Sequence, residues 1–251
     1  TARSNPASYV GAFNAIRNLF AQAPMSLERG YKPGTFSFNS GDGRCPTCKG
    51  TGFEHIEMQF LSDVYLRCPD CHGKRFRDEV CEVRVEHLGQ SASIDDVLEM
   101  TVYQALEFFK GLREVQTALQ PLIDVGLEYV KLGQPVPTLS GGEAQRLKLA
   151  GHLAEASRSR TKGKQLALKG SLFLFDEPTT GLHFDDVARL MQAFRKLLAA
   201  GHSLIIIEHN LDLVRAADWL IDLGPGGGEH GGKVIAQGTP DTLKKLPNSY
   251  T

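Results

Sequence analysis

Long apolar runs are missing from this sequence of 251 residues. No stretch approaches the roughly 20 apolar residues that a membrane-spanning helix requires, so we expect no membrane association. A secretory leader is missing too, because the first six residues form a polar stretch without an apolar core. We therefore expect a cytoplasmic protein. The chain also begins without methionine, which suggests a piece of a longer protein.

An excess of charge of either sign is missing as well. The 28 Lys and Arg residues nearly balance the 29 Asp and Glu residues, which gives a net charge of −1 with histidine neutral. The contents of hydrophobic residues (41%) and charged residues (23%) are ordinary for a soluble globular protein. Because the whole chain has no net attraction to nucleic acid, any DNA-binding surface must be local.

Cysteine is scarce, but four of the five cysteines form two matched pairs. The pairs are Cys45-Pro-Thr-Cys48 and Cys68-Pro-Asp-Cys71, with nineteen residues between them. Two such turns can present four thiolates to one ion, which is the ligand set of a closed, structural Zn²⁺ site. The pattern indicates metal binding in a reducing compartment rather than disulfides. A redox-active pair is the alternative, but it does not explain two matched turns, and Cys81 lies outside the pattern.

Polar and basic residues flank the cysteine pairs on both sides. Between the pairs, apolar and polar residues alternate over residues 56–60 and again over 64–66, which predicts a two-stranded hairpin with a turn at Ser62-Asp63. Residues 72–77 place basic side chains around one phenylalanine. An amphipathic helix predicted from Val10 to Phe20 is similarly surrounded by polar and basic groups. Each set is either a solvated surface or a site of contact with nucleic-acid phosphates.

The stretch Leu-Ser-Gly-Gly-Glu-Ala-Gln-Arg at residues 139–146 predicts the start of a helix. Ser140 and Glu143 have the spacing of a capping box, in which each side chain caps the other residue's backbone. Gly141 and Gly142 leave their backbone N–H groups unshielded, so this helix start can bind an anion. The plain alternative is an ordinary capped helix.

Residues 80–85 predict a strand, and helices are expected after it up to Val125. Thr101 and Gln104 have the spacing of a second capping box, and Gly126 is expected to end a helix that runs from Arg113 to Val125.

Farther along the chain, two short apolar strands end in polar residues. Ser171 to Phe175 precedes Asp176-Glu177-Pro178, and Leu204 to Ile207 precedes Glu208-His209-Asn210. Strands and helices alternate from Ser171 to a last strand at residues 219–223, which predicts a mainly parallel α/β sheet.

The order of these motifs resembles that of the ABC ATPase family, with an LSGGE signature, a Walker B strand LFLFDEP, a D-loop and a switch histidine. The zinc module ahead of the signature resembles the C-terminal half of the UvrA family, including its shorter paralogues. The matching stretches cover nearly the whole chain and are RSNP (3–6), FSFN (36–39), both cysteine pairs, MQFL and DVY (58–61, 63–65), LGQ and TLSGGEAQRLKLA (within 132–150), DEPTTGLH (176–183), EHNLD (208–212) and ADWLIDLGP (217–225).

This resemblance implies an α/β fold in which an ABC-ATPase-type parallel sheet lobe is joined to a helical signature subdomain with an inserted zinc module. The expected segments are the start of a signature and DNA-binding subdomain (1–44), the four-cysteine zinc module with its hairpin (45–78), the helical signature subdomain (79–170) and the Walker B and switch-histidine lobe (171–251). The P-loop pattern Gly-x4-Gly-Lys-Ser/Thr is absent, and the family carries it upstream of the residue that matches Thr1. We therefore expect the chain by itself to bind ATP poorly and not to hydrolyse it.

The family pattern also implies roles for individual residues. Asp176 is expected to hold Mg²⁺, Glu177 to orient or deprotonate the attacking water, and His209 to contact the γ-phosphate. ABC sites form between two ATPase halves, so the signature residues are expected to close on nucleotide held by a different P-loop. These cofactor-binding residues are Ser140, Gly141, Gly142 and Glu143. The implied cofactors are structural Zn²⁺, and ATP or ADP with Mg²⁺ in the intact protein.

The implied function is DNA-damage recognition in nucleotide excision repair, with ATP binding and hydrolysis coupled to lesion sensing. The implied partners are damaged double-stranded DNA, the N-terminal ATPase half of the same protein, a second copy in a homodimer and a UvrB-like protein. The expected DNA contacts lie near the N-terminus and beside the zinc hairpin and are Arg3, Ser4, Asn5, Tyr9, Arg17, Lys74, Arg75 and Arg77.

Three alternatives remain open from the sequence. One is a UvrA-like paralogue used in drug resistance or tolerance of DNA intercalators. Another is a zinc-bearing interaction module without ATPase activity, although the intact Asp176, Glu177 and His209 argue against it. The last is an ABC-type ATPase that acts on ribosomes or drugs, which does not predict paired cysteines at this place.

Overall fold

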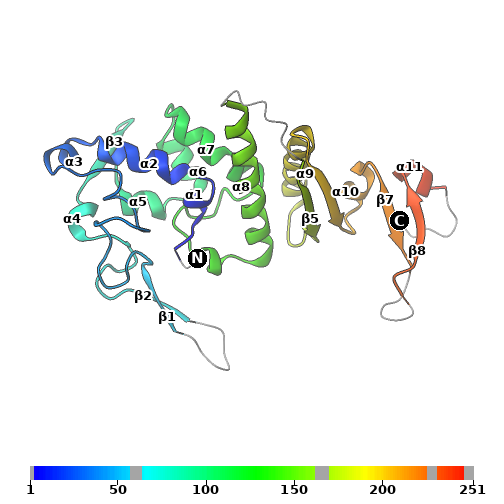
Figure 1. Ribbon diagram of the computed structural model, residues 1–251, viewed down its shortest axis with the longest axis horizontal. Helices are drawn as coiled ribbons and strands as arrows, with labels where there is room; N and C mark the ends of the chain where they lie inside the picture. Colours follow the sequence, from blue (N-terminus) through cyan, green and yellow to red (C-terminus); the bar gives the residue numbers. More distant parts are fainter. Residues whose placement is uncertain (1–2, 57–63, 162–169, 225–230, 246–251) are drawn as a thin grey trace.

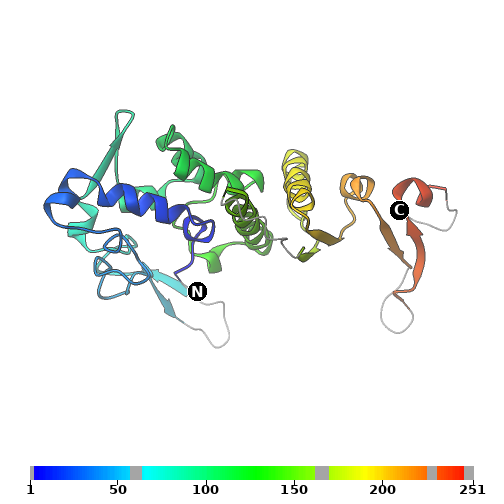
Figure 2. The same ribbon diagram turned by 45° about the horizontal axis from the view of Figure 1, so that its top comes forward.

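The computed structural model describes residues 3–56, 64–161, 170–224 and 231–245. Figure 1 shows an elongated arrangement. The N-terminal helices and the hairpin of β1 (Phe53–Ile56) and β2 (Val64–Arg67) lie at one end, and the C-terminal strands lie at the other. Figure 2 shows the same order, with α8 (Gly141–Thr161) between the N-terminal helices and the strands that follow. Within the described part of the chain, no helix is long and apolar enough to cross a membrane.

The helix predicted from Val10 to Phe20 is present as α2 (Ala12–Ala21). Two shorter helices flank it, α1 (Pro6–Tyr9) and α3 (Pro24–Glu28). Gly11, whose φ of +78° lies in the left-handed region, separates α1 from α2. The predicted apolar face is also present, because Phe13, Ile16 and Phe20 are buried in the core.

An aromatic cluster joins α2 to the region of the cysteine pairs. The ring centroid of Phe38 lies 4.7 Å from that of Phe13 on α2 and 6.3 Å from that of Phe76, which follows the second cysteine pair. All three rings are buried. Pairs of this kind add about 0.5–1.5 kcal/mol each beyond the burial of their surface. The cysteine region is therefore packed onto the helical core.

The hairpin predicted between the cysteine pairs is present. Strand β1 (Phe53–Ile56) pairs antiparallel with β2 (Val64–Arg67), with Ile56 opposite Val64. The predicted turn at Ser62-Asp63 lies outside the described residues. As Figure 1 shows, this hairpin projects away from the helices.

The strand predicted over Val80 to Val85 is wrong. The chain forms helix α4 (Asp78–Cys81) and only then strand β3 (Arg84–His87), which pairs with β4 (Gln90–Ser93). Asp78 and Glu79 occupy the first turn of α4, where negative side chains stabilise the positive end of the helix dipole. The acidic first turn therefore favours a helix here, and Val80 is the buried residue of that helix.

Three further helices complete the helical part of the molecule. They are α5 (Ile94–Glu99), α6 (Val102–Phe108) and α7 (Arg113–Asp124). The predicted capping box at the start of α6 is present, because the Thr101 side chain accepts from the Gln104 backbone N–H. The predicted stop after α7 is also present at Gly126, whose φ is +72°. A 3₁₀ turn, η1 (Val136–Thr138), then leads to α8.

The predicted alternation of strand and helix follows α8. The elements are β5 (Leu172–Asp176), α9 (Phe184–Ala199), β6 (Ser203–Ile207), α10 (Leu211–Ala216), β7 (Leu220–Leu223), β8 (Val234–Gly238) and α11 (Pro240–Leu243). Strands β5 and β6 pair in parallel, as predicted. Strand β7 pairs antiparallel with β8, so in the described residues the parallel sheet consists of β5 and β6.

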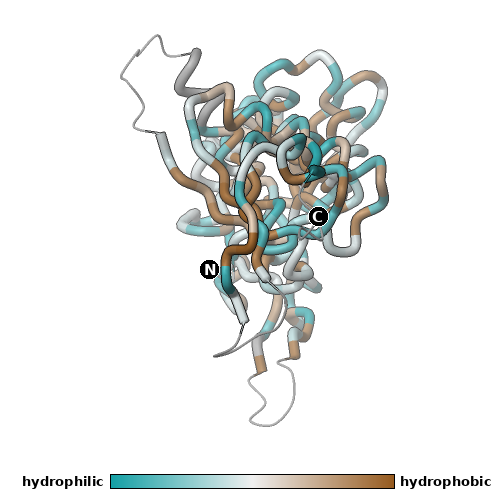
Figure 3. Tube along the Cα trace, turned by 90° about the vertical axis from the view of Figure 1, so that its right-hand side faces the viewer, coloured by the Kyte–Doolittle hydropathy of each residue, from teal (hydrophilic) through white to brown (hydrophobic). Residues whose placement is uncertain are grey.

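The parallel pair is covered by helices on one face. Phe173 and Phe175 of β5 pack on the core, with Phe175 4.9 Å from Phe194 of α9 between ring centroids. The alternate residues Leu174 and Ile207 are exposed on the other face. Figure 3, viewed from the C-terminal side, shows hydrophobic and hydrophilic segments interspersed along the trace.

Candidate metal centre and nucleotide-contact site

The four predicted zinc ligands come together in one buried cluster. All four sulfur atoms lie within 4.8 Å of one another, and the Sγ–Sγ distances are 3.9 Å for Cys45 and Cys68 and 3.6 Å for Cys48 and Cys71. A tetrahedral Zn²⁺ with Zn–S bonds of about 2.3 Å separates its sulfur ligands by about 3.8 Å. The geometry therefore fits this ion.

Without a metal ion, burial favours the neutral thiols of Cys45 and Cys71. Burial raises the pKa of the Cys71 thiol to about 12 and also raises that of Cys45. A bound metal ion removes these protons because the thiolate is the ligand. The turns themselves depend on glycine: Gly50 has a φ of +89°, and a Cβ at this position would lie 2.1 Å from the Phe38 carbonyl oxygen. Any larger residue at Gly50 would displace the first cysteine turn.

Arg75, which was predicted to contact DNA, is buried beneath the cysteine cluster with only 3% of its surface exposed. Its Nη2 donates to the Gly133 carbonyl at 2.7 Å, and its guanidinium carbon lies 5.2 Å from the centroid of the Phe38 ring. Burial lowers the pKa of Arg75 to about 10. Arg75 therefore joins the cysteine module to the loop before the signature and is not available at the surface.

Asn5 is also fully buried, because its side chain caps α1 by accepting from the Ser8 backbone N–H at 2.8 Å. The other predicted DNA contacts remain at least partly accessible. Among them, the Tyr9 ring packs against α8, where a Cβ added at Gly151 would lie 2.8 Å from its Cε1 atom. The backbone of Ser4 accepts from the Val136 N–H at 2.9 Å, which joins the N-terminus to the loop before the signature.

Arg44, for which the sequence predicted no role, lies in a cluster with Arg3 and Arg77. Arg3 and Arg44 both donate through Nη1 to the Asn39 carbonyl, at 3.2 and 3.0 Å, and Arg77 Nε donates to the Arg44 carbonyl at 3.3 Å. None of the three guanidinium groups has a carboxylate within 4.0 Å among the described residues. Arg44 precedes the first cysteine, and only its proximity to Arg3 in space marks it as part of this cluster.

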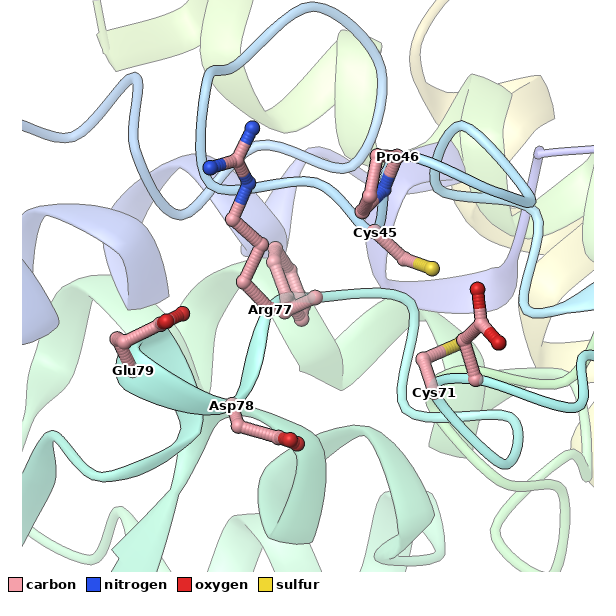
Figure 4. Close-up of a pocket in the computed structure, with 8 residues that line it drawn as sticks. Cys45, Pro46, Cys71, Arg77, Asp78 and Glu79 are labelled. Carbon is pink, nitrogen blue, oxygen red and sulfur yellow. The ribbon is translucent and has the colours of Figure 1, made fainter.

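A hollow of about 330 Å³ lies beside the first and last cysteines of the cluster. Its charged lining includes Asp70, Asp78 and Glu79 besides Arg77. Figure 4 shows the Arg77 guanidinium extending away from the carboxylates of Asp78 and Glu79. The acidic lining makes the hollow itself a poor place for a phosphate, whereas the Arg77 head group is directed toward the Arg44 side.

The predicted capping box is present at the start of α8. Ser140 N and Oγ donate to Glu143 Oε2 at 2.8 and 2.9 Å, and Glu143 N donates to Ser140 Oγ at 3.3 Å. Tyr129 Oη donates to the other carboxylate oxygen, Oε1, at 2.7 Å. Burial by itself would raise the pKa of Glu143, but the hydrogen bonds from Ser140 and Tyr129 and the charge of Arg146 together lower it. Glu143 is therefore an ionised carboxylate at the positive end of a helix.

The start of α8 lies beside the loop that follows β5. A Cβ added at Gly142 would lie 3.7 Å from the Thr180 carbonyl oxygen, and one added at Gly141 would meet nothing within 4 Å. The amides at the start of α8 and the segment after Asp176-Glu177 therefore lie close together in space. This proximity joins residues that are nearly forty positions apart in the sequence.

The carboxyl ends of β5 and β6 bring Glu177 and His209 together. Asp176 pairs with Ile207 in the sheet, and Glu177 N donates to the Ile207 carbonyl at 2.9 Å. His209 Nδ1 lies 4.0 Å from Glu177 Oε1. The φ of Glu177 is +44°, an unusual value for a residue with a side chain and one that often accompanies a functional role.

Glu208, for which no role was predicted, fixes the two loops at this edge. Its carboxylate accepts from the backbone N–H groups of Thr179 at 2.9 Å, His209 at 2.8 Å and Asn210 at 3.0 Å, and from the Thr179 hydroxyl. Burial by itself would raise the pKa of Glu208, but these hydrogen bonds outweigh it and lower the pKa. Glu208 therefore holds the loop after Glu177 against the loop that carries His209.

No family model matches the chain. The whole chain is nevertheless similar to one region of much longer proteins. It is 52% identical over 251 residues to UvrABC system protein A of Aquifex aeolicus, which covers 100% of this chain and 26% of the relative. It is 52% identical over 243 residues to UvrABC system protein A of Thermus thermophilus, which covers 97% of this chain and 24% of the relative. The chain thus spans about a quarter of the length of these curated relatives.

A solved structure agrees with the sequence comparison. The chain is similar to the crystal structure of UvrA2 from Deinococcus radiodurans with a TM-score of 0.83 and 45% identity, covering 100% of this chain and 29% of that one. At this level of similarity the α/β fold described above is shared with the corresponding region of that protein.

Proposed function

We propose that this chain, which is homologous over its full length to a region of UvrA proteins, is the signature and Walker B part of a UvrA-type DNA-damage-recognition ATPase. The observation that carries the proposal is that one chain holds both an anion-binding helix start, at α8, and a carboxylate beside a histidine, at the ends of β5 and β6. The two features would act on different nucleotides, because the signature segment closes on a nucleotide held by another ATPase lobe.

ATP with Mg²⁺ would supply the reactive phosphate, and the chain's own residues would prepare it for attack by water. Asp176 would hold the metal ion, directly or through water. Glu177 would orient or deprotonate the attacking water, and its proximity to His209 supports a shared role at the γ-phosphate. Glu208 would hold the two loops in register, because its carboxylate accepts hydrogen bonds from both.

The amides at the start of α8 would bind the terminal phosphate of a nucleotide held by another ATPase lobe. Ser140, Gly141, Gly142 and Glu143 would provide this contact, so the site would be completed by the N-terminal half of the same protein or by a second copy in a homodimer. A UvrB-like protein would be a further partner of the assembled ATPase.

The cluster of Arg3, Arg44 and Arg77 would contact the phosphate backbone of damaged double-stranded DNA. Its support is that Arg3 and Arg44 donate to one carbonyl, that Arg77 donates to the Arg44 backbone, and that none of the three has a carboxylate within 4.0 Å among the described residues. Ser4, Tyr9, Arg17 and Lys74 would extend this surface, whereas the buried Asn5 and Arg75 would not. Lesions have no fixed base code, so recognition would use the backbone and the deformability of the duplex.

Zinc would have a structural role in this assembly. Cys45, Cys48, Cys68 and Cys71 would use all four positions of a tetrahedral ion, which leaves none for a substrate. The ion would fix the hairpin of β1 and β2 and, through Arg75, the loop before the signature. Its removal would therefore disturb the N-terminal surface and the signature together.

The substitution Glu177→Gln in the complete protein that carries this chain tests the proposal. We expect ATP hydrolysis to fall by about 100-fold or more, the usual effect of removing a general base, while ATP binding persists. Phosphate release and nucleotide binding are the two measurements. Glu107→Gln, which changes an exposed glutamate on α6, is the matched control and should leave both unchanged. Hydrolysis at the wild-type rate in Glu177→Gln would contradict the assigned role.

A further inference from the structure

The Ser140 hydroxyl, which is proposed to contact a phosphate, already makes a hydrogen bond within the chain. It lies 2.9 Å from Glu143 Oε2, and the Ser140 backbone N–H donates to the same oxygen at 2.8 Å. A negatively charged carboxylate thus occupies the helix start where an anion would bind. An arriving phosphate would have to compete with Glu143 for these donors, because both groups are negative and use the same N–H and O–H groups.

Tyr129 holds the opposite side of that carboxylate. Its Oη donates to Glu143 Oε1 at 2.7 Å and accepts from Arg146 Nη2 at 3.3 Å. Arg146 is only 6% exposed, and its Nε has no hydrogen-bond partner among the described residues. The three side chains form a line from a buried cation through a phenol to the carboxylate.

The backbone around Tyr129 is fixed on both sides. Tyr103 N donates to the Glu128 carbonyl at 3.0 Å, and Val102 N donates to the Val130 carbonyl at 2.9 Å. The Glu128 side chain pairs with Arg189 on α9, the helix that follows the loop of Thr180. Tyr129 therefore lies on a backbone segment that is held to α6 on one side and to α9 on the other. Helix α9 belongs to the lobe that carries Glu177.

We propose that Tyr129 is a positioning residue for the nucleotide contact, holding the Glu143 carboxylate on the Tyr129 side so that the Ser140 hydroxyl and the amides of α8 can turn to a terminal phosphate. The inference rests on the proposed function of the signature segment. Without the phenol, Glu143 keeps its hydrogen bonds to Ser140 only and remains in the path of the phosphate.

The first test is independent of ATP turnover and uses this chain. Tyr129→Phe removes the hydrogen bond and little else, so hydrogen exchange at the amides of residues 141–143 should change by several-fold while the chain still unfolds cooperatively on heating. Tyr103→Phe is the matched control, because Tyr103 is exposed and its hydroxyl has no hydrogen-bond partner among the described residues. Identical exchange in Tyr129→Phe and wild type overturns the positioning role, whatever the protein does with nucleotide.

The second test uses the complete protein that carries this chain. Tyr129→Phe should raise the KM for ATP by up to about tenfold, as expected for one hydrogen bond to a charged group, with a smaller change in kcat. If Tyr129 acts through Glu143, the effect of Tyr129→Phe should vanish in a Glu143→Ala background. An unchanged KM, or an effect of full size in that background, overturns the inference. A wild-type protein that neither binds nor hydrolyses ATP instead contradicts the proposed function, and the exchange experiment still decides the role of Tyr129.

Discussion

Arg75 Nη2 donates to the carbonyl oxygen of Gly133 at 2.7 Å across 58 positions of sequence. Gly133 is itself in close contact with its surroundings, because a Cβ added there would lie 2.8 Å from both the Cβ and the carbonyl oxygen of Leu98. The loop before the signature is thus confined between α5 and the cysteine module. A displacement within that module would therefore also move the segment that leads to Ser140.

The substitution Arg75→Met should lower the free energy of unfolding by about 2 kcal/mol, because the partly buried Gly133 carbonyl loses a hydrogen bond from a charged donor. Arg75 remains charged at neutral pH, since burial lowers its pKa only to about 10. Urea denaturation measures the change. Lys74→Met, at the exposed neighbouring position, is the control and should stay within about 0.5 kcal/mol of wild type. Equal stability of the two variants would show that the Arg75 contact contributes nothing.

Metal analysis of the purified chain should find one zinc ion per molecule. Cys45→Ser should lose the ion and lower the melting temperature, because a four-ligand site that loses one thiolate binds zinc much more weakly. Cys81→Ser is the matched control, since Cys81 lies outside the cluster, and it should keep the full zinc content. Zinc bound equally by both variants would exclude the four-cysteine site.

Acid should weaken the contact between the loops at the ends of β5 and β6. The pKa of Glu208 is lowered in the folded chain, so its contribution to stability is fully present above the unfolded value of about 4.3 and is lost as the pH falls through the lower folded value. Glu208→Gln should therefore be less stable than wild type at pH 7, with a difference that shrinks toward pH 3. Melting temperatures of both proteins between these limits provide the measurement, and a constant difference would contradict the assigned cause.

Arg44→Ala should weaken DNA binding by the complete protein and reduce the slope of log affinity against log salt by about one, because one phosphate contact is lost. Arg29→Ala is the control, since Arg29 is already paired with Glu82 at 2.6 Å. Fluorescence anisotropy with a lesion-containing duplex at several salt concentrations measures both quantities. An Arg44→Ala protein with the wild-type slope would remove Arg44 from the DNA surface.

Features that depend on neighbours in the sequence could be predicted from the sequence. The capping boxes at Thr101 and Ser140 each use partners three positions apart, and Gly126 ends α7 through its own backbone conformation. The strand predicted at Val80 is wrong for a local reason too, because Asp78 and Glu79 favour the first turn of helix α4. The sequence also predicted the parallel pairing of β5 with β6, because two short apolar runs are separated by a helical segment.

The paired spacing of Cys45, Cys48, Cys68 and Cys71 and the order of the signature and strand motifs were determined by the sequence alone, because short-range geometry and residue chemistry specify them. Only the tertiary structure decided that Arg75 faces inward to Gly133, that Arg44 joins Arg3, and that Tyr129 reaches Glu143. Each of these pairs joins residues that are distant in the sequence. The local sequence around a basic or aromatic side chain does not show whether that side chain lies on the surface or bridges two elements. Packing of the helices against the cysteine module and α8 determines which of the two it does.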